Sequence, residues 1–577
     1  MRGTALRSPV ALLALILAGH VLAWSLHPFA FLDDLDSQHY ARLAAEMLAG
    51  KFTLAPHTFN CRFGVTVPTA AVYGILGIGP RTTTLWPLVA SLLTIVVVFA
   101  TTYRAFGRSA ALLAALLLAT NVTQVEYAAH LLPDIIVSGL MLGSAALLCA
   151  ARDAHGGAAS RPWLHGGLCA VALVAALLTK ETVVWALPFF LGVLAYDLAR
   201  RRNVRVWTAI VATGAVCLGL FFLSYYLTTG NPLHALDSVE EKHNVSVQAS
   251  FAGKSSAQYL HRLTLAPIQF LVDQLGYGYL VLLAVPALIH MVRPLRSLPS
   301  GVRLWTAYAA VLLLCFWFGT TSLRSYNPLP ISPRFLMPLL APLSILGGVT
   351  LARFLSGDKH EHSARVGMLL TAAAFVAAGA ALLPSRPARS AMYGVLGLAL
   401  AFLASPVRHF LRGRLAKVTR LAIIAVLSLG ILVYYGSRGG VKEPNSLRVI
   451  ERDFIQRHVA RLPEDAVVFT DEHSAFVLPL LLERNGASRV RVADWSDAAA
   501  VRAHAGVPAF VFVDQTTLSM MNEWLGREIP SFAREPPPHW QRLASAATLW
   551  RGGSDLFRDG QQILLLEIDD PTELLLR

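Results

Sequence analysis

The sequence predicts a polytopic α-helical membrane protein with a small α/β domain at its C-terminal end. First, 55% of the 577 residues are hydrophobic and only 15% are charged, whereas a soluble domain has about 25% charged residues. Second, apolar runs of about 16 to 22 residues recur between residues 8 and 436, the length that a membrane-spanning helix needs. Third, from residue 437 the apolar segments become short and alternate with charged residues.

The apolar runs mark about thirteen membrane spans. The first follows Arg2 and Arg7 without a small-residue cleavage site, so we interpret it as an uncleaved helix and not as a signal peptide. The runs lie near 8–26, 84–103, 109–126, 134–151, 164–179, 182–198, 206–227, 273–292, 304–320, 334–352, 366–383, 390–405 and 420–436.

Basic residues are concentrated in every second loop between these runs, for example Arg104 and Arg108, or Arg200 to Arg202. The positive-inside rule then places these loops and the N-terminus in the cytoplasm, and an odd number of spans places the C-terminal domain outside. We attribute the net charge of +14 to this topology and to contact with anionic lipid. No nucleic-acid motif is present, so nucleic acid is not an expected partner.

The C-terminal segment, 437–577, is typical of a small α/β domain. The stretches "AVVFTD", "RVRVAD", "AFVFVD" and "QILLLEI" predict strands, and helical stretches separate them. Such alternation favours a largely parallel sheet. Asp471, Asp494 and Asp514 end three of these strands, where a carboxylate either binds a ligand or caps the next helix.

The first outer loop, 27–83, carries a group of acids beside an expected helix. Asp36 begins a segment that we expect to be helical through Ala49, with Gly50 as its stop. Tyr40 lies four residues on and shares the same helix face. Asp36 is either the N-cap of this helix or a general base at the outer membrane surface. Later in the loop, residues 67–78 predict a helix lying along the membrane interface.

A second acid lies on the same outer side. Asp134 follows Pro133 at the start of the fourth predicted span. Ionisable residues at such depth are costly, so Asp134 is either functional or a helix cap.

Cations are expected on this side as well, although the positive-inside rule disfavours them there. They are Arg62, Lys180 and Arg334. Arginine holds phosphate bidentately and lysine holds it as a point charge. The alternative for each is snorkelling or a structural salt bridge, for example between Lys180 and Glu181. Two acids and several cations on one face suit transfer of a sugar from a lipid phosphate.

These motifs, in this order, resemble the GT-C-fold glycosyltransferases, the group that includes protein O-mannosyltransferases and the lipid A aminoarabinose transferase. The resemblance covers residues 8–436. It rests on Asp36 and Tyr40 leading into "ARLAAEMLAG", Asp134, Arg62 before an amphipathic stretch, and Arg334 in "PRFLMPLLAP". Ser37 departs from the acidic pair of many members, whereas Asp33 and Asp34 form such a pair slightly earlier. The base therefore stays open among Asp33, Asp34 and Asp36.

The resemblance implies an inverting transferase of the bacterial cytoplasmic (inner) membrane and cell envelope. It would move a monosaccharide, hexosyl or pentosyl, from a polyprenyl-phosphate donor to a lipid, glycan or protein acceptor on the outer face. Asp36 and Asp134 would be catalytic, and a divalent cation, Mg²⁺ or Mn²⁺, is left open at these two acids. The expected substrate contacts are Asp33, Asp34, Tyr40, Arg62, Lys180, Glu181, His243 and Arg334.

Two other classes of function compete with this enzyme. A transporter or lipid flippase often has internal repeats and charges deep within its spans. Here no repeat is evident and the charges lie at the ends of the spans. A non-catalytic scaffold would account for residues 437–577 but not for acids and cations on one face. We therefore expect residues 1–436 to be a GT-C-like catalytic domain.

Overall fold

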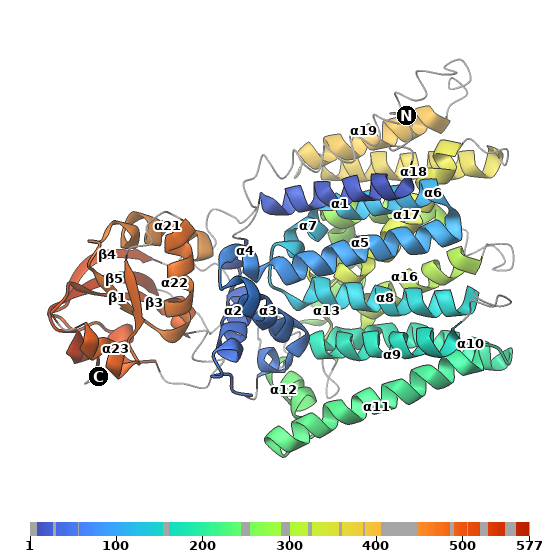
Figure 1. Ribbon diagram of the computed structural model, residues 1–577. Helices are drawn as coiled ribbons and strands as arrows, with labels where there is room; N and C mark the ends of the chain where they lie inside the picture. The colour runs from blue at the N-terminus through green and yellow to red at the C-terminus, as the bar shows by residue number, and fades with distance from the viewer. Residues whose placement is uncertain are drawn as a thin grey trace, which may run out of the picture.

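The computed structural model shows a helical bundle with a small sheet domain beside one end of it (Figure 1). It describes residues 8–575 except for these positions: 27–29, 56, 154–160, 244–253, 290–299, 321–325, 330, 357–360, 385–386, 405–446, 485–489, 505, 520–528 and 548–560. The predicted boundary between residues 436 and 437, and the predicted span 420–436, lie outside the described residues.

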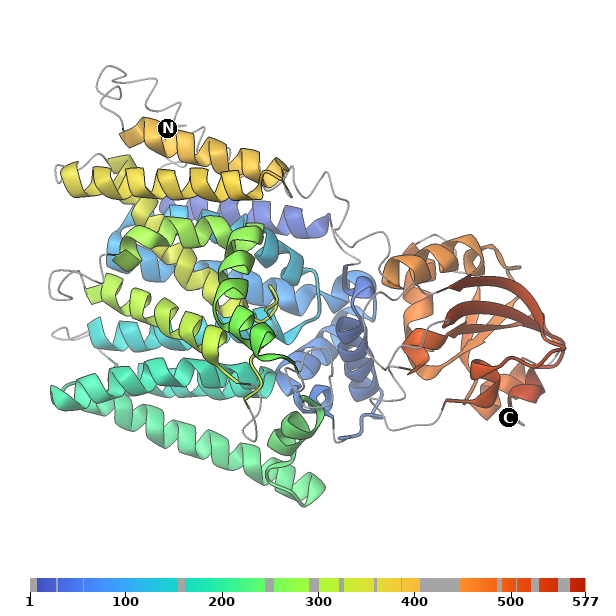
Figure 2. The same ribbon diagram turned by 180° about the vertical axis from the view of Figure 1, so that it is seen from behind.

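The bundle is built from long apolar helices that run alongside one another (Figures 1 and 2). Short helices and 3-10 turns connect several of them. In chain order they are α1 (Pro9–Ser25), α5 (Leu85–Phe106), α6 (Arg108–Ala119), α7 (Val122–Ala128), α8 (Pro133–Asp153), α9 (Pro162–Thr179), η4 (Glu181–Ala186), α10 (Leu187–Ala199), α11 (Val204–Thr229), α12 (His234–His243), α13 (Ser256–Leu263), α14 (Leu265–Asp273), α15 (Leu275–Ile289), α16 (Ser300–Phe318), η6 (Met337–Leu339), α17 (Leu340–Ser356), α18 (Glu361–Leu382) and α19 (Pro387–Ala404).

The described part of the chain has seven helices that are long and apolar enough to cross a membrane, or up to nine if each of two bent helix pairs is one span. The bent pairs are α6 with α7 and α14 with α15. Helices α1, α18 and α19 coincide with further predicted spans, although their apolar parts are shorter. The class of polytopic helical membrane protein is confirmed, and the count of thirteen spans stays a prediction.

Short helices of the first outer loop lie across one end of the bundle (Figure 1). They are η2 (Ala30–Asp33), α2 (Leu35–Leu48), η3 (Thr58–Cys61), α3 (Phe63–Leu76) and α4 (Pro80–Thr83). The predicted end of α2 is confirmed, because Ala49 is its C-cap and Gly50 has a left-handed φ of 68°. Helix α3 exposes Ile75 and Leu76 while burying Tyr73, which fits a helix along the membrane interface.

The C-terminal domain contains one mixed sheet of five strands in the order β2-β1-β3-β5-β4. Strands β2, β1 and β3 pair in parallel, as predicted, but β5 pairs antiparallel with both β3 and β4. The prediction of a largely parallel sheet is therefore wrong for one side of it. The elements are α21 (Leu447–Arg457), η8 (Val459–Arg461), β1 (Val467–Thr470), α22 (Glu472–Arg484), β2 (Arg491–Asp494), α23 (Ala498–Ala503), β3 (Ala509–Asp514), α25 (Ser531–Arg534), β4 (Gln541–Ala547), β5 (Gln562–Ile568) and η9 (Pro571–Leu575).

Both faces of the central strands are buried, so their side chains alternate between two apolar clusters. Val468 and Phe510 belong to the cluster that includes residues of α21 and α22. Val467 and Val511 belong to the cluster on the opposite face. Helices α21 and α22 lie between the sheet and the short helices of the first outer loop (Figures 1 and 2).

Two polar contacts join the sheet domain to α2. Arg42 Nη1 donates to Glu472 Oε1 of α22 at 2.8 Å. The Nε2 atom of His473 lies 3.0 Å from Gln38 Oε1. The sheet domain thus holds the helix that carries Asp36 and Tyr40.

The α17–α6 contact gives a prediction about packing. Gly348 of α17 lies against Ala110 and Ala114 of α6, and small residues such as these let two helices approach closely. A Cβ added to Gly348 would therefore lie only 2.6 Å from the backbone nitrogen of Ala114 and 2.8 Å from the backbone oxygen of Ala110. Gly348→Ala should lower the free energy of unfolding by about 1 to 3 kcal/mol through overpacking. Thermal unfolding in detergent would measure this. Gly219→Ala is the control, because its Cβ meets nothing within 4 Å; equal melting temperatures for the two variants would contradict the close contact.

Candidate active site

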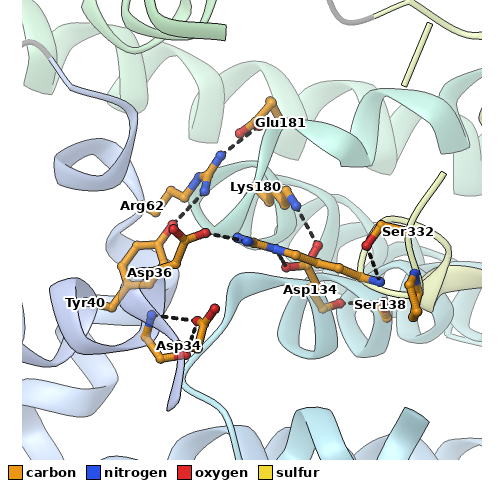
Figure 3. A network of polar contacts seen from close by, with 12 residues as sticks. Asp34, Asp36, Tyr40, Arg62, Asp134, Ser138, Lys180, Glu181 and Ser332 are labelled. Atoms are coloured by element: carbon orange, nitrogen blue, oxygen red, sulfur yellow. Dashed lines mark hydrogen bonds and ion pairs between the residues drawn. The ribbon is translucent and has the colours of Figure 1, made fainter. Parts of the chain in front are cut away.

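Six charged side chains meet where the short helices cover the end of the bundle. They come from the start of α2, the start of α3, the start of α8, the break between α9 and η4, and the segment before η6. Figure 3 labels five of them, Asp36, Arg62, Asp134, Lys180 and Glu181, and shows their side chains turned toward one another. We call this set the charge cluster: Asp36, Arg62, Asp134, Lys180, Glu181 and Arg334.

The start of α2 shows which acid caps the helix. Asp34 is the N-cap, and its Oδ2 accepts from the backbone nitrogen of Ser37 at 2.9 Å and from the Ser37 hydroxyl at 2.7 Å. Asp36 lies in the first turn, and its carboxylate is directed to the charge cluster (Figure 3). The capping alternative for Asp36 is therefore wrong, because the side chain of Asp34, and not that of Asp36, accepts a free backbone N–H of this turn.

Arg334 joins the two acids that the sequence singled out. Its Nη1 forms an ion pair with Asp36 Oδ2, and its Nε lies 2.8 Å from Asp134 Oδ2. The two carboxylates differ in access, since the Asp36 side chain is 20% exposed and that of Asp134 is 3% exposed. Asp134 is thus a buried anchor, whereas Asp36 is open on one side.

Lys180 completes the pairing of Asp134. Its Nζ lies 2.5 Å from Asp134 Oδ1 and 4.5 Å from the centre of the Phe335 ring. The alternative of a salt bridge between Lys180 and Glu181 is not what the structure shows. Burial, the largest effect, outweighs the attraction of Asp134 and lowers the pKa of Lys180 to about 8.

Arg62 links a second branch of the cluster. It donates to the Tyr40 hydroxyl at 2.6 Å through Nη1 and pairs with Glu181 Oε1 at 2.8 Å through Nη2. Burial opposes its charge, yet the attraction of Glu181 and Tyr40 is stronger, so the pKa of Arg62 is raised above its ordinary value. Tyr40 is fully buried, and this burial raises its pKa, so the phenol stays neutral.

Three of the predicted substrate contacts, Asp33, Asp34 and His243, are not among the residues that the described contacts join to this network. Asp34 is a helix cap, as described above. Asp33 ends η2, and His243 ends α12; the side chains of both lie outside the described residues. The structure therefore assembles Asp36, Tyr40, Arg62, Asp134, Lys180, Glu181 and Arg334 out of the residues predicted from sequence.

Sequence reasoning missed the residues that position Arg334. The Tyr277 hydroxyl donates to the carbonyl oxygen of Pro333 at 2.8 Å, one residue before Arg334. The buried Arg262 donates to the carbonyl oxygens of Leu329 at 2.7 Å and Trp317 at 3.0 Å. In the sequence, Arg262 is only a single basic residue in a polar loop. Nothing local indicates that its partners are carbonyl groups 55 and 67 residues away.

The two acids do not fit a divalent cation. Asp36 and Asp134 are bridged by the Arg334 guanidinium, and Asp134 is also paired with Lys180. A metal ion would have to displace these cations. Among the described residues, no group of three or more His, Cys, Asp or Glu side chains could hold a metal ion.

Two of the three end-strand acids of the sheet domain serve as caps. Asp471 Oδ1 accepts from the backbone nitrogens of His473 and Ser474, and Asp514 Oδ1 accepts from those of Thr516 and Thr517. Asp494 accepts from the backbone nitrogen of Ser496 at 2.8 Å in a turn, and the N-cap of the next helix, α23, is Asp497. Of the alternatives given by the sequence, the capping role is observed for Asp471 and Asp514.

The fold and the comparisons agree on the class of protein. Residues 69–226 match the family described as dolichyl-phosphate-mannose-protein mannosyltransferase. The predicted class, a membrane protein of the GT-C glycosyltransferase fold with a small C-terminal sheet domain, is confirmed. A search of curated protein sequences found no match.

The chain is similar in fold to ArnT from Cupriavidus metallidurans. The apo structure of ArnT superposes with a TM-score of 0.58 at 18% identity, covering 96% of this chain and 98% of that chain. The structure of ArnT bound to undecaprenyl phosphate superposes with a TM-score of 0.55 at 18% identity, covering 96% and 97%. At this identity the likeness concerns the fold, and it includes the sheet domain because nearly the whole chain is aligned.

The buried pairing of Asp134 gives a prediction about stability. Asp134→Asn leaves Lys180 and Arg334 without their shared buried carboxylate, and breaking such a pair costs about 3 to 5 kcal/mol. The double variant Asp134→Asn with Lys180→Met should recover part of this loss, because it removes the uncompensated charge of Lys180, whereas Arg334 still pairs with Asp36. Thermal unfolding in detergent compares the variants. Additive losses in the double variant would show that the ion pair does not exist in the membrane protein.

Proposed function

We propose that this chain is a membrane glycosyltransferase that moves a monosaccharide from a polyprenyl-phosphate donor to an acceptor hydroxyl or amine on the outer face of the membrane. The observation that carries the proposal is the charge cluster, in which three cations adjoin three carboxylates and the Asp36 carboxylate is partly exposed. The mannosyltransferase family match and the fold of ArnT, crystallised with undecaprenyl phosphate, support this donor class.

Asp36 is proposed as the general base. Its Oδ2 is held by Arg334, whereas its Oδ1 has no hydrogen-bond partner within the described ranges of the chain, and the side chain is partly exposed. An acceptor hydroxyl can therefore approach Oδ1 and lose its proton to it as the acceptor oxygen attacks the anomeric carbon. The bond from that carbon to the donor phosphate breaks in the same displacement.

Asp134 is proposed to orient the cations and not to attack the sugar. Both of its oxygens are paired, Oδ1 with Lys180 and Oδ2 with Arg334, and its side chain is 3% exposed. Glu181 pairs with Arg62, so we do not assign it as a nucleophile either. A single displacement with inversion of the anomeric centre then follows, since a retaining mechanism needs a second carboxylate as nucleophile.

The donor phosphate is proposed to bind between Arg62, Lys180 and Arg334. Preorganised cations stabilise the charge that grows on a leaving phosphate. Each cation is held by a carboxylate in the structure described here, so its position is already set before the donor binds. Glu181 and Tyr40 would act on the donor only through Arg62.

The assignment of the base predicts how two neighbouring variants differ. Asp36→Asn should lower transfer by about 100-fold or more, the range of general base catalysis, because an amide cannot take the acceptor proton. Asp34→Asn is the matched control, since asparagine also caps helices, and it should keep most of the activity. Turnover of radiolabelled polyprenyl-phosphate sugars with crude membrane acceptors measures both. Inactivity of Asp34→Asn or Asp33→Asn with an active Asp36→Asn would transfer the role to the earlier acids.

The lowered pKa of Lys180, about 8, predicts an alkaline limit to activity. The cation that contacts the phosphate is present below this pH and is lost as the pH rises through it, so kcat/KM should fall above about pH 8. Lys180→Arg keeps its charge throughout this range, so its kcat/KM should not show this fall. Profiles from pH 6 to pH 10 for both proteins test the point, and identical alkaline limbs would assign the limit to another group.

A further inference from the structure

A cavity lies toward the opposite end of the bundle from the charge cluster. Its volume is about 430 Å³, within the range of about 300 to 1,000 Å³ typical of ligand pockets. It opens between α5, α8, α9 and α16, and residues Gly143 to Arg152 of α8 line one side. Asp134 and Arg152 lie near the two ends of α8, so the rise of a helix places them roughly 27 Å apart.

The lining of this cavity has an apolar interior and a basic rim. Val97, Leu147 and Leu304 face its interior, together with the buried Trp305. The basic side chains come from helix ends: Arg104 in the last turn of α5, Arg152 in the last turn of α8, and His165 in the first turn of α9. An amphiphile with an acyl chain and an anionic headgroup matches this distribution of apolar and positive surface.

The two arginines of the rim differ in their partners. Arg152 pairs with Asp197 at 2.5 Å, and Asp197 also accepts from Trp207 Nε1 at 2.9 Å. Arg104 is exposed and has no ion pair or hydrogen bond to its side chain among the residues that the structure describes. Arg104 is thus able to bind a phosphate without breaking a pair, as guanidinium groups do bidentately.

We propose that this cavity binds an anionic glycerophospholipid, with one acyl chain between α5, α8 and α16 and the headgroup phosphate on Arg104. The loops at this end are the basic ones that the positive-inside rule places in the cytoplasm, where anionic lipid is attracted to basic side chains. The occupant is a lipid of the surrounding bilayer. The site does not depend on the transfer reaction, since no residue of the charge cluster lines it.

The chain offers a matched pair of variants for testing this site. Gly143 lines the cavity, and a Cβ added there meets nothing within 4 Å, so Gly143→Phe should fill the cavity without a backbone clash. Gly219 of α11 is equally open but does not line the cavity, so Gly219→Phe is the steric control. Arg104→Gln removes the proposed phosphate contact, and Arg205→Gln, an exposed arginine at the start of α11, is its charge control.

Native mass spectrometry of the detergent-solubilised full chain would measure binding of added phosphatidylglycerol and of phosphatidylcholine. The wild-type protein should bind phosphatidylglycerol more tightly than phosphatidylcholine. Gly143→Phe should lose this binding, and Arg104→Gln should weaken it about fivefold, the value of one basic residue near an anionic headgroup. Both controls should resemble wild type. Unchanged binding in Gly143→Phe, or equal affinity of wild type for the two lipids, would overturn the proposal.

Discussion

The contact of Arg334 with both Asp36 and Asp134 is the constraint on which the rest of the site depends. It connects three segments that are far apart in the sequence: the start of α2, the start of α8 and the segment before η6. A buried charge without its partner costs several kcal/mol, so the ends of these segments must meet for the pairs to form. Two further ion pairs bring in two more segments. Lys180, at the break between α9 and η4, must reach Asp134, and Arg62, at the start of α3, must reach Glu181.

The surrounding structure holds this contact from two sides. Arg262 donates to the carbonyl oxygen of Leu329, and the Tyr277 hydroxyl donates to that of Pro333. These bonds fix the backbone just before Arg334 and so limit how far the Arg334 guanidinium can move. On the other side, α22 of the sheet domain contacts α2 through Glu472 and His473. The sheet domain therefore supports the helix that carries Asp36, although its own strand-end acids serve only local helix caps and turns.

Local rules predicted much of this arrangement, and the failures are non-local. The extent of α2 and its stop at Gly50 follow from helix signals, and the shared face of Asp36 and Tyr40 follows from helical spacing. The partner of Lys180 was not predictable, because the extended backbone at residue 180 directs its side chain to Asp134, 46 residues away, and not to the adjacent Glu181. Strand β4, "QRLASAA", was missed because an edge strand with few β-branched residues lacks a strand signal.

The charge balance of the cluster connects the proposed base to the proposed leaving group. Three cations face three carboxylates, so the cluster is formally neutral before substrates bind. In the proposed reaction, Asp36 takes the acceptor proton, so that its negative charge disappears as an equal charge appears on the leaving phosphate. Arg334 loses its attraction to Asp36 at that moment but stays attached to Asp134, so its Nη1 becomes available to the phosphate. A lysine at position 334 could not serve both acids and the phosphate in this way, because it lacks the planar fork of several donors.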